Sequence, residues 1–166
     1  MKSNLEIVEM PLAEYFEKWG QDPSRVITLE IPPDPEYVKV VRLAASGIAS
    51  QKGFNVEEVD DIKVALAEAC TNAIAHGYKS EREPTNTIII RFLVGDPNAL
   101  YVSVTDKGTG FNVKAIPAQP HAEAKEGAIP HLGVGIYLIR QLMDEVLIHS
   151  GPDHGTIVYM QKRHRG

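Results

Sequence analysis

Hydrophobic and polar positions change their spacing several times along this chain of 166 residues, and each change predicts a new element. Apolar residues spaced three to four apart predict helices over 10–20, 35–52, 55–77 and 134–143. Alternating or short continuous apolar runs predict strands over 26–31, 87–94, 99–105, 145–150 and 155–161. Residues 107–132 show no period and several glycine and proline breaks, which predicts a long loop.

The order of these elements predicts the fold class. Strands do not alternate one-for-one with helices, so a doubly wound parallel sheet is not expected. The two middle strands lie close enough in sequence to form a hairpin, and so do the last two. We therefore expect an α+β two-layer sandwich, in which a mixed, mostly antiparallel sheet carries about three helices on one face.

The apolar stripe of each predicted helix identifies the side that it buries. In the helix over 55–77 this stripe consists of Val59, Ile62, Leu66, Ala69 and Ala73. The short helix over 10–20 has its own stripe, formed by Leu12, Tyr15, Phe16 and Trp19. Packing of that stripe onto the rest of the domain is the simpler interpretation, and contact with another chain is the alternative.

Composition and charge narrow the function classes. The formal net charge is -5 and the sequence pI is about 5.7, so the dense basic face that sequence-independent nucleic-acid binding needs is not expected. The basic cluster 162–165 is interpreted as a solvated tail. The single cysteine, Cys70, excludes an intrachain disulfide and a thiolate zinc cluster. No apolar run approaches the roughly 20 residues of a membrane span, and we expect a cytoplasmic protein without a signal peptide.

Two groups of polar residues could carry chemistry at the edge of a pocket. Glu68 and Asn72 are four positions apart and share a helix face roughly 110° from the centre of the core stripe. An amide oxygen can ligate magnesium and a carboxylate can accept a proton, although a solvated helix edge is the simpler interpretation of the pair taken alone. Asp106, Gly108 and Gly110 follow a predicted strand, where a carboxylate can accept a hydrogen bond from an amine. A plain turn is the alternative there.

Two glycine motifs complete the set. Gly133 and Gly135 open the helix over 134–143, and free amides at a helix N-terminus can bind phosphate. The dinucleotide-binding pattern G-x-G-x-x-G is excluded because its third glycine would fall at Leu138. Gly155 and Thr156 enter the last predicted strand, where a hairpin glycine and a β-favouring threonine are ordinary.

The order of the four motifs carries more information than any one of them. E-x-x-x-N on a helix, D-x-G-x-G after a strand, G-x-G opening a helix and G-T on a strand resemble the ATP-binding fold of gyrase, MutL, heat-shock chaperones and histidine kinases. More narrowly, the sequence is similar to the bacterial anti-sigma-factor serine kinases in four segments, EACTNAIAHGY, VTDKGTGF, GVGIYLIRQLMDEV and PEYVKVVRLAASGIASQKGF. The resemblance covers about residues 25–163. It predicts a domain there, an N-terminal extension over 1–24 and a tail over 164–166.

The resemblance also implies a role for each motif. Glu68 would be the general base on a substrate hydroxyl, and Asn72 would bind Mg²⁺. Asp106 would recognise the adenine amine of ATP, with Thr156 supporting that contact. The remaining binding residues would shape the nucleotide pocket or lie beside the phosphates: Gly108, Gly110, Gly133, Val134 and Gly135.

The same resemblance implies an ATP-dependent serine/threonine protein kinase that acts as an anti-sigma factor. Its partners would be a sigma factor and an antagonist protein that accepts phosphate on serine, and it would form a homodimer. A catalytically silent binding module of the same fold is the alternative. The catalytic domain of a histidine kinase is disfavoured, because no histidine precedes residue 25.

Residues 111–132 would form a lid over ATP. Family members often carry a basic residue and an extra glycine just before G-x-G, whereas this chain has Ile129, Pro130, His131 and Leu132. Lys114 and Lys125 are the only lysines or arginines in the segment.

Overall fold

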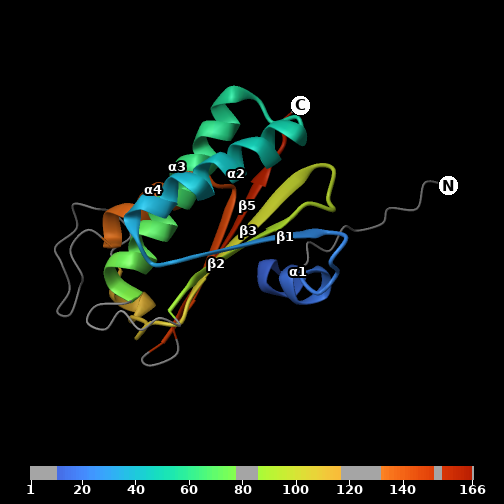
Figure 1. The fold of residues 1–166 in the computed structure, drawn as a ribbon. Coiled ribbons are helices and arrows are strands. Elements are labelled where there is room, and N and C mark those ends of the chain that lie inside the picture. Colours follow the sequence, from blue (N-terminus) through green and yellow to red (C-terminus); the bar gives the residue numbers. More distant parts are fainter. Residues whose placement is uncertain (1–10, 78–85, 117–131, 152–154, 166) are drawn as a thin grey trace.

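A single five-stranded sheet organises the computed structural model, which describes residues 11–77, 86–116, 132–151 and 155–165 (Figure 1). The strand order is β1-β2-β3-β5-β4, and each neighbouring pair in these ranges is antiparallel. The strands are β1 (Val26–Ile31), β2 (Ile88–Leu93), β3 (Ala99–Asp106), β4 (Glu145–Ser150) and β5 (Thr156–Arg163). The expected α+β fold is confirmed, and the sheet is antiparallel throughout its described strands.

Four α-helices accompany the sheet in the described ranges: α1 (Leu12–Trp19), α2 (Val38–Gln51), α3 (Val56–Asn72) and α4 (Leu132–Leu142). A short 3₁₀ turn, Pro35–Tyr37, leads into α2, and a second one, Val113–Ala115, follows β3. Helix α3 begins at a capping box in which Asn55 and Glu58 each accept the other's backbone N–H. It continues into a π-helical turn, Ala73–Gly77.

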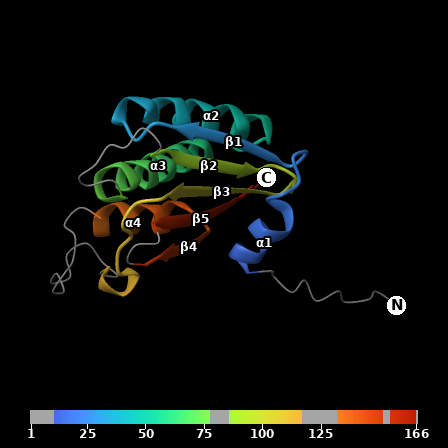
Figure 2. The ribbon, with the colours of Figure 1, turned by 60° about the horizontal axis from the view of Figure 1, so that its bottom comes forward.

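Alternating residues of the sheet supply two separate hydrophobic cores. The larger core joins α2, α3 and α4 to one face of the sheet, and the predicted α3 stripe is buried in it from Val59 to Ala73. On β3, Leu100, Val102 and Val104 point into this core, while Tyr101 belongs to the smaller one. Figure 2 shows the consequence, with α2 and α3 on one side of the sheet and α1 on the other.

Helix α1 covers the second face of the sheet. Leu12 and Phe16 are buried, and Tyr15 stacks on Tyr101 with ring centroids 3.8 Å apart. Arg91 of β2 donates to the carbonyl of Gly20, at the C-terminal end of the helix. The apolar stripe of the helix is thus used within the chain, which confirms the simpler interpretation.

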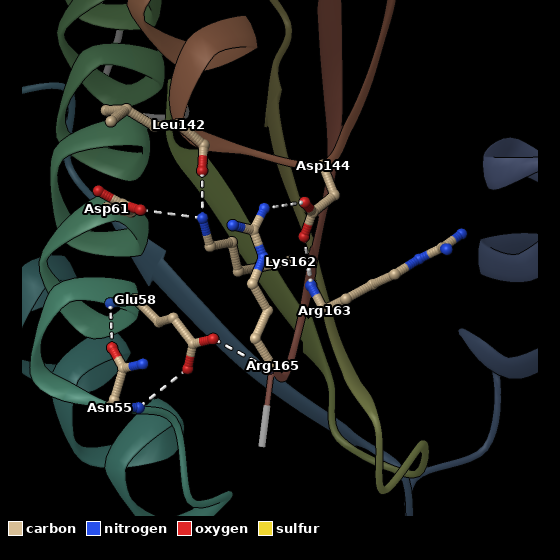
Figure 3. A network of polar contacts seen from close by, with 8 residues as sticks. All are labelled: Asn55, Glu58, Asp61, Leu142, Asp144, Lys162, Arg163 and Arg165. Atoms are coloured by element: carbon tan, nitrogen blue, oxygen red, sulfur yellow. Dashed lines mark hydrogen bonds and ion pairs between the residues drawn. The ribbon is translucent and has the colours of Figure 1, made fainter.

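The interpretation of the C-terminal basic cluster as a solvated tail is wrong for its first member. Lys162 is only 4% exposed, and its ammonium group lies 2.9 Å from the Asp61 carboxylate. The end of β5 is held further by the backbone N–H of Arg165, which donates to Glu58 (Figure 3). The prediction failed because the sequence carries no sign that Asp61 and Glu58, more than 100 residues earlier, lie against this strand.

Within the described ranges, no helix combines the length and the apolar character needed to cross a membrane.

Candidate functional site

A pocket opens between α3, the start of α4 and the adjoining ends of β3 and β5. Its lining combines an amide, a carboxylate and a hydroxyl with an apolar wall: Ala69, Asn72, Ala73, Val104, Asp106, Gly110, Phe111, Ile136, Thr156 and Val158. Members of the helix motif, the D-x-G-x-G motif and the G-T motif therefore meet in one cavity. These motifs are far apart in sequence, and antiparallel pairing of β3 with β5 brings Asp106 opposite Thr156.

Asn72 lines this pocket, whereas Glu68 does not, and both side chains face Gly135 in the first turn of α4. Both are half-buried, as their position beside the core stripe predicts. A Cβ built on Gly135 would lie 3.0 Å from Glu68 Oε2 and 3.0 Å from Asn72 Nδ2. The two side chains can approach the α4 backbone this closely only because residue 135 has no side chain.

Asp106 lies at the inner end of the pocket and is only 6% exposed. Burial raises the pKa of its carboxyl group, and hydrogen bonds from the backbone N–H groups of Gly108 and Thr156 partly oppose this shift. The Gly108 N–H lies 2.9 Å from Oδ1. The carboxylate is therefore held in one orientation and has acceptor capacity left for a ligand amine.

Two glycines with positive φ allow the backbone to close around Asp106. Gly110 has a φ of 69°, and a Cβ there would lie 1.9 Å from the carbonyl oxygen of Gly151. Gly155 has a φ of 70°, and its Cβ would lie 2.3 Å from the carbonyl oxygen of Asp106. Any other residue at either position would force these loops apart.

The structure adds Ser150, which sequence reasoning did not single out. Its hydroxyl oxygen accepts the Phe111 N–H at 2.9 Å and lies 2.7 Å from the Thr156 hydroxyl. Ser150 thereby fastens the loop after β3 to the strand that carries Thr156. The only sequence signal was its place at the end of a predicted strand beside the G-T motif.

The apolar wall of the pocket was also missed as part of a site. Ala69 and Ala73 were predicted only as core residues, and they are indeed buried, as is Ile136. The same helical period that buries a residue cannot distinguish packing against another side chain from packing against a ligand. Tertiary structure alone places these three beside Asp106.

Not every predicted site residue lines the pocket. Helix α4 begins at Leu132, two residues earlier than expected, so Gly133 and Val134 lie in its first turn. Val134 is 46% exposed and points away, and Gly133 is half-buried. Both residues can still contribute unpaired backbone N–H groups at the helix start.

Of the predicted lid, Lys125 and His131 lie outside the described residues, whereas Lys114 is exposed within the Val113–Ala115 turn.

Cys70 lies next to the site in sequence but takes no part in it. Its side chain is fully buried in the larger core. Burial raises the pKa of the thiol to about 12, so it stays protonated and unreactive at neutral pH.

The donor set suits a magnesium nucleotide better than a free metal ion. In the part of the chain that the structure describes, no three His, Cys, Asp or Glu side chains are grouped to hold a metal. Magnesium is commonly held by one or two protein oxygens together with substrate phosphates and water. The Asn72 side chain, beside the N-terminal turn of α4, fits that arrangement.

The fold and the site define a class of nucleotide-binding proteins. The family model described as "Histidine kinase-like ATPase domain" matches residues 31–162. Among solved structures, the RsbU and RsbW domains of a Mycobacterium tuberculosis protein align with a TM-score of 0.60 at 18% identity. That alignment covers 84% of this chain and 32% of the other. A histidine kinase domain from Erythrobacter litoralis aligns with a TM-score of 0.51 at 20% identity, over 92% of this chain and 70% of that one. At these identities the structures support the fold alone.

Curated relatives narrow the class. The serine-protein kinase RsbW of Bacillus pumilus is 38% identical over 140 residues, which are 82% of this chain and 85% of that protein. The proteins of the same name from Bacillus licheniformis and Listeria monocytogenes are each 37% identical over 139 residues. They too match 82% of this chain, and 84% and 85% of their own lengths. The chain belongs to the RsbW family of serine-protein kinases, within the histidine kinase-like ATPases.

Proposed function

We propose that this protein transfers the γ-phosphoryl group of ATP to a serine on an antagonist protein, and that it also sequesters a sigma factor. The observation that carries the catalytic part is that Glu68 and Asn72 each have an atom 3.0 Å from the position that a Cβ on Gly135 would take, next to the Asp106 pocket that Asn72 lines. Family membership supports the kinase activity. The antagonist and the sigma factor are carried over from the resemblance.

Each motif has a distinct task in this proposal. The Asp106 carboxylate, which the Gly108 N–H holds in place, accepts a hydrogen bond from the adenine amine. Thr156 supports this contact. Ala69, Ala73 and Ile136 offer the apolar surface on which a base can lie. The backbone N–H groups of Gly133, Val134 and Gly135, at the start of α4, face the phosphates.

Glu68 acts on the acceptor. Its carboxylate orients the serine hydroxyl and takes its proton while the oxygen forms a bond to phosphorus and the bond to ADP breaks. Phosphoryl transfer depends mainly on alignment and charge neutralisation, so the fixed approach of Glu68 to the α4 backbone is its most important property. Asn72 would help to hold magnesium, which would supply charge neutralisation at the phosphates when bound.

Replacing the base tests the catalytic role. We expect Glu68→Gln to keep ATP affinity within about twofold while phosphate transfer falls about 10²- to 10⁴-fold, because the amide cannot accept the proton. Calorimetry with ATP and magnesium and transfer of radiolabelled phosphate to the antagonist measure the two effects. Glu57→Gln is the matched control, since Glu57 is exposed in the first turn of the same helix. Unchanged transfer by Glu68→Gln removes the proposed base.

Replacing the adenine ligand tests the binding role. We expect Asp106→Asn to weaken ATP binding about tenfold or more, because one acceptor oxygen becomes an N–H₂ group that opposes the adenine amine. The amide oxygen can still accept from Gly108, so the local fold is kept. Asp60→Asn, at an exposed position of α3, is the control. Equal affinity in calorimetry would show that Asp106 does not contact adenine.

Partners and assembly extend the proposal. We place the kinase domain at residues 25–163, with 1–24 as an extension and 164–166 as a tail, and we expect a homodimer. Since a sigma factor works with RNA polymerase, the protein acts in the cytoplasm. Pull-down from native cells with and without ATP, followed by mass spectrometry, identifies the partners. Recovery of a sigma factor without any phosphate transfer to the antagonist would instead indicate a catalytically silent binding module.

A further inference from the structure

One buried lysine joins the two helices that form the catalytic side of the pocket. The Lys162 ammonium lies 2.9 Å from Asp61 Oδ2 on α3 and 2.6 Å from the carbonyl oxygen of Leu142, the last residue of α4 (Figure 3). Lys162 itself belongs to β5 and is 4% exposed. A single charged group of the sheet therefore contacts both α3 and the C-terminal end of α4, in addition to the apolar core that they share.

The two helices also meet at a second point, which is the functional site. There, Glu68 of α3 lies against Gly135 of α4. Glu68 follows Asp61 by seven residues, and Gly135 precedes Leu142 by seven residues, so the two helices are antiparallel. The two contact points are therefore separated by about 10 Å along each helix. A shift of α4 along α3 cannot change one contact without changing the other.

We propose that Lys162 is a positioning residue, which sets the register of α4 against α3 and thereby the place of the α4 amides relative to Glu68 and Asn72. Lys162 does not touch the nucleotide. An interior ammonium with a carboxylate and a helix-terminal carbonyl as partners makes charge-assisted contacts to both helices at one place. This inference rests on the proposed function for its kinetic readout.

The effect is confined to the phosphate side of the pocket. Asp106 and Thr156, on paired strands, hold the adenine side. The contacts of Lys162 with Asp61 and Leu142, here called the clamp, do not include them. Loss of the clamp should therefore reduce interactions with magnesium and phosphates and leave adenosine binding alone. A purely stabilising role for Lys162 would lower the melting temperature and leave the ratio of ATP affinity to adenosine affinity unchanged.

The test compares Lys162→Met with Arg165→Met in the full chain. Arg165 is a cation of the same network, but its guanidinium pairs with Asp144 and does not reach α4. We expect Lys162→Met to lower Mg·ATP affinity and the transfer rate at saturating ATP about tenfold to a hundredfold, since a displacement near 1 Å has effects of that size. Adenosine affinity stays within about twofold of wild type. Arg165→Met leaves the Mg·ATP affinity, the transfer rate and the adenosine affinity within about twofold of wild type.

Two further measurements keep the test decisive. Asp61→Asn removes the charge of a partly exposed partner and should act in the same direction, so it replaces Lys162→Met if that variant does not fold. The NMR resonance of the Gly135 amide should shift in either variant, and this measurement does not require the protein to be active. A folded variant with the wild-type ATP-to-adenosine affinity ratio and an unmoved Gly135 resonance overturns the positioning role. Absence of transfer by the wild-type protein would contradict the proposed function, and the affinity ratio and resonance would still test the clamp.

Discussion

Gly135 is a helical glycine whose missing side chain leaves room for Glu68 and Asn72 at the candidate site. The residue lies inside α4, where glycine costs about 1 kcal/mol of stability relative to alanine. Its backbone φ is ordinary, so conformational freedom does not explain the glycine. The atoms that a Cβ would meet belong to the ends of Glu68 and Asn72, which can move. We therefore expect stability and function to make opposite demands at this position.

Gly135→Ala should separate these demands. We expect the free energy of unfolding to stay equal or to rise by up to about 1 kcal/mol, while phosphate transfer falls about tenfold or more because Glu68 and Asn72 are displaced. Urea unfolding and transfer assays measure the two quantities. Gly47→Ala is the matched control, since Gly47 is also helical and a Cβ there meets nothing within 4 Å. It should stabilise the protein similarly at full activity, and equal activity of both variants would contradict the assigned contact.

Helix α1 lies wholly outside the matched family range of residues 31–162. It nevertheless covers the sheet face opposite the nucleotide pocket. Phe16 is 4% exposed, with its ring 5.0 Å from Tyr159 and 6.5 Å from Tyr101 between centroids. The helix thus adds a second core, and none of its residues lines the Asp106 pocket.

Phe16→Ala should therefore affect stability and not the site. We expect a loss of about 3–5 kcal/mol in the free energy of unfolding, which is usual for a buried phenylalanine. ATP affinity at a temperature where the variant is folded should equal that of wild type. Leu43→Ala provides the control, because Leu43 is 73% exposed and its loss should change stability by no more than about 0.5 kcal/mol. Weakened ATP binding by folded Phe16→Ala would indicate coupling between the two sheet faces.

At the scale of the whole molecule, the end of β5 is tied to distant parts of the chain by carboxylates. Burial raises the pKa of Asp144, but the backbone N–H of Arg163 and the Arg165 guanidinium outweigh it, and the net shift is downward. Because the folded pKa lies below the unfolded one, Asp144 stabilises the fold at neutral pH. That stabilisation is lost as the pH falls through the folded pKa.

Asp144→Asn should therefore cost stability only where the carboxylate is ionised. We expect the difference in the free energy of unfolding between wild type and variant to be largest near pH 7 and to vanish progressively below about pH 4. Chemical denaturation at a series of pH values measures it. Asp34→Asn serves as the control on a carboxylate away from this network. A difference that is independent of pH would show that the side chain acts by packing rather than by charge.

Much of the fold could be predicted because its determinants are local. The period of Val59, Ile62 and Leu66 marked the buried side of α3, and the alternation on β3 separated Val102 from Tyr101. The ends of helices and strands were predicted less accurately, as in α4, which begins two residues before the predicted start. The two-residue error arose because glycine is unfavourable inside a helix, so Gly133 was expected to precede the first turn.

By itself, the sequence determined the element types, their buried faces and the four motifs that place the chain in its family, because spacing along the chain is a local property. Tertiary structure alone decided which motifs touch. The closeness of Gly135 to Glu68, the part of Ser150 in holding Thr156, and the burial of Lys162 against Asp61 all depend on segments far apart in sequence. Such contacts are set by sheet pairing and helix packing, which no periodicity within a single segment records.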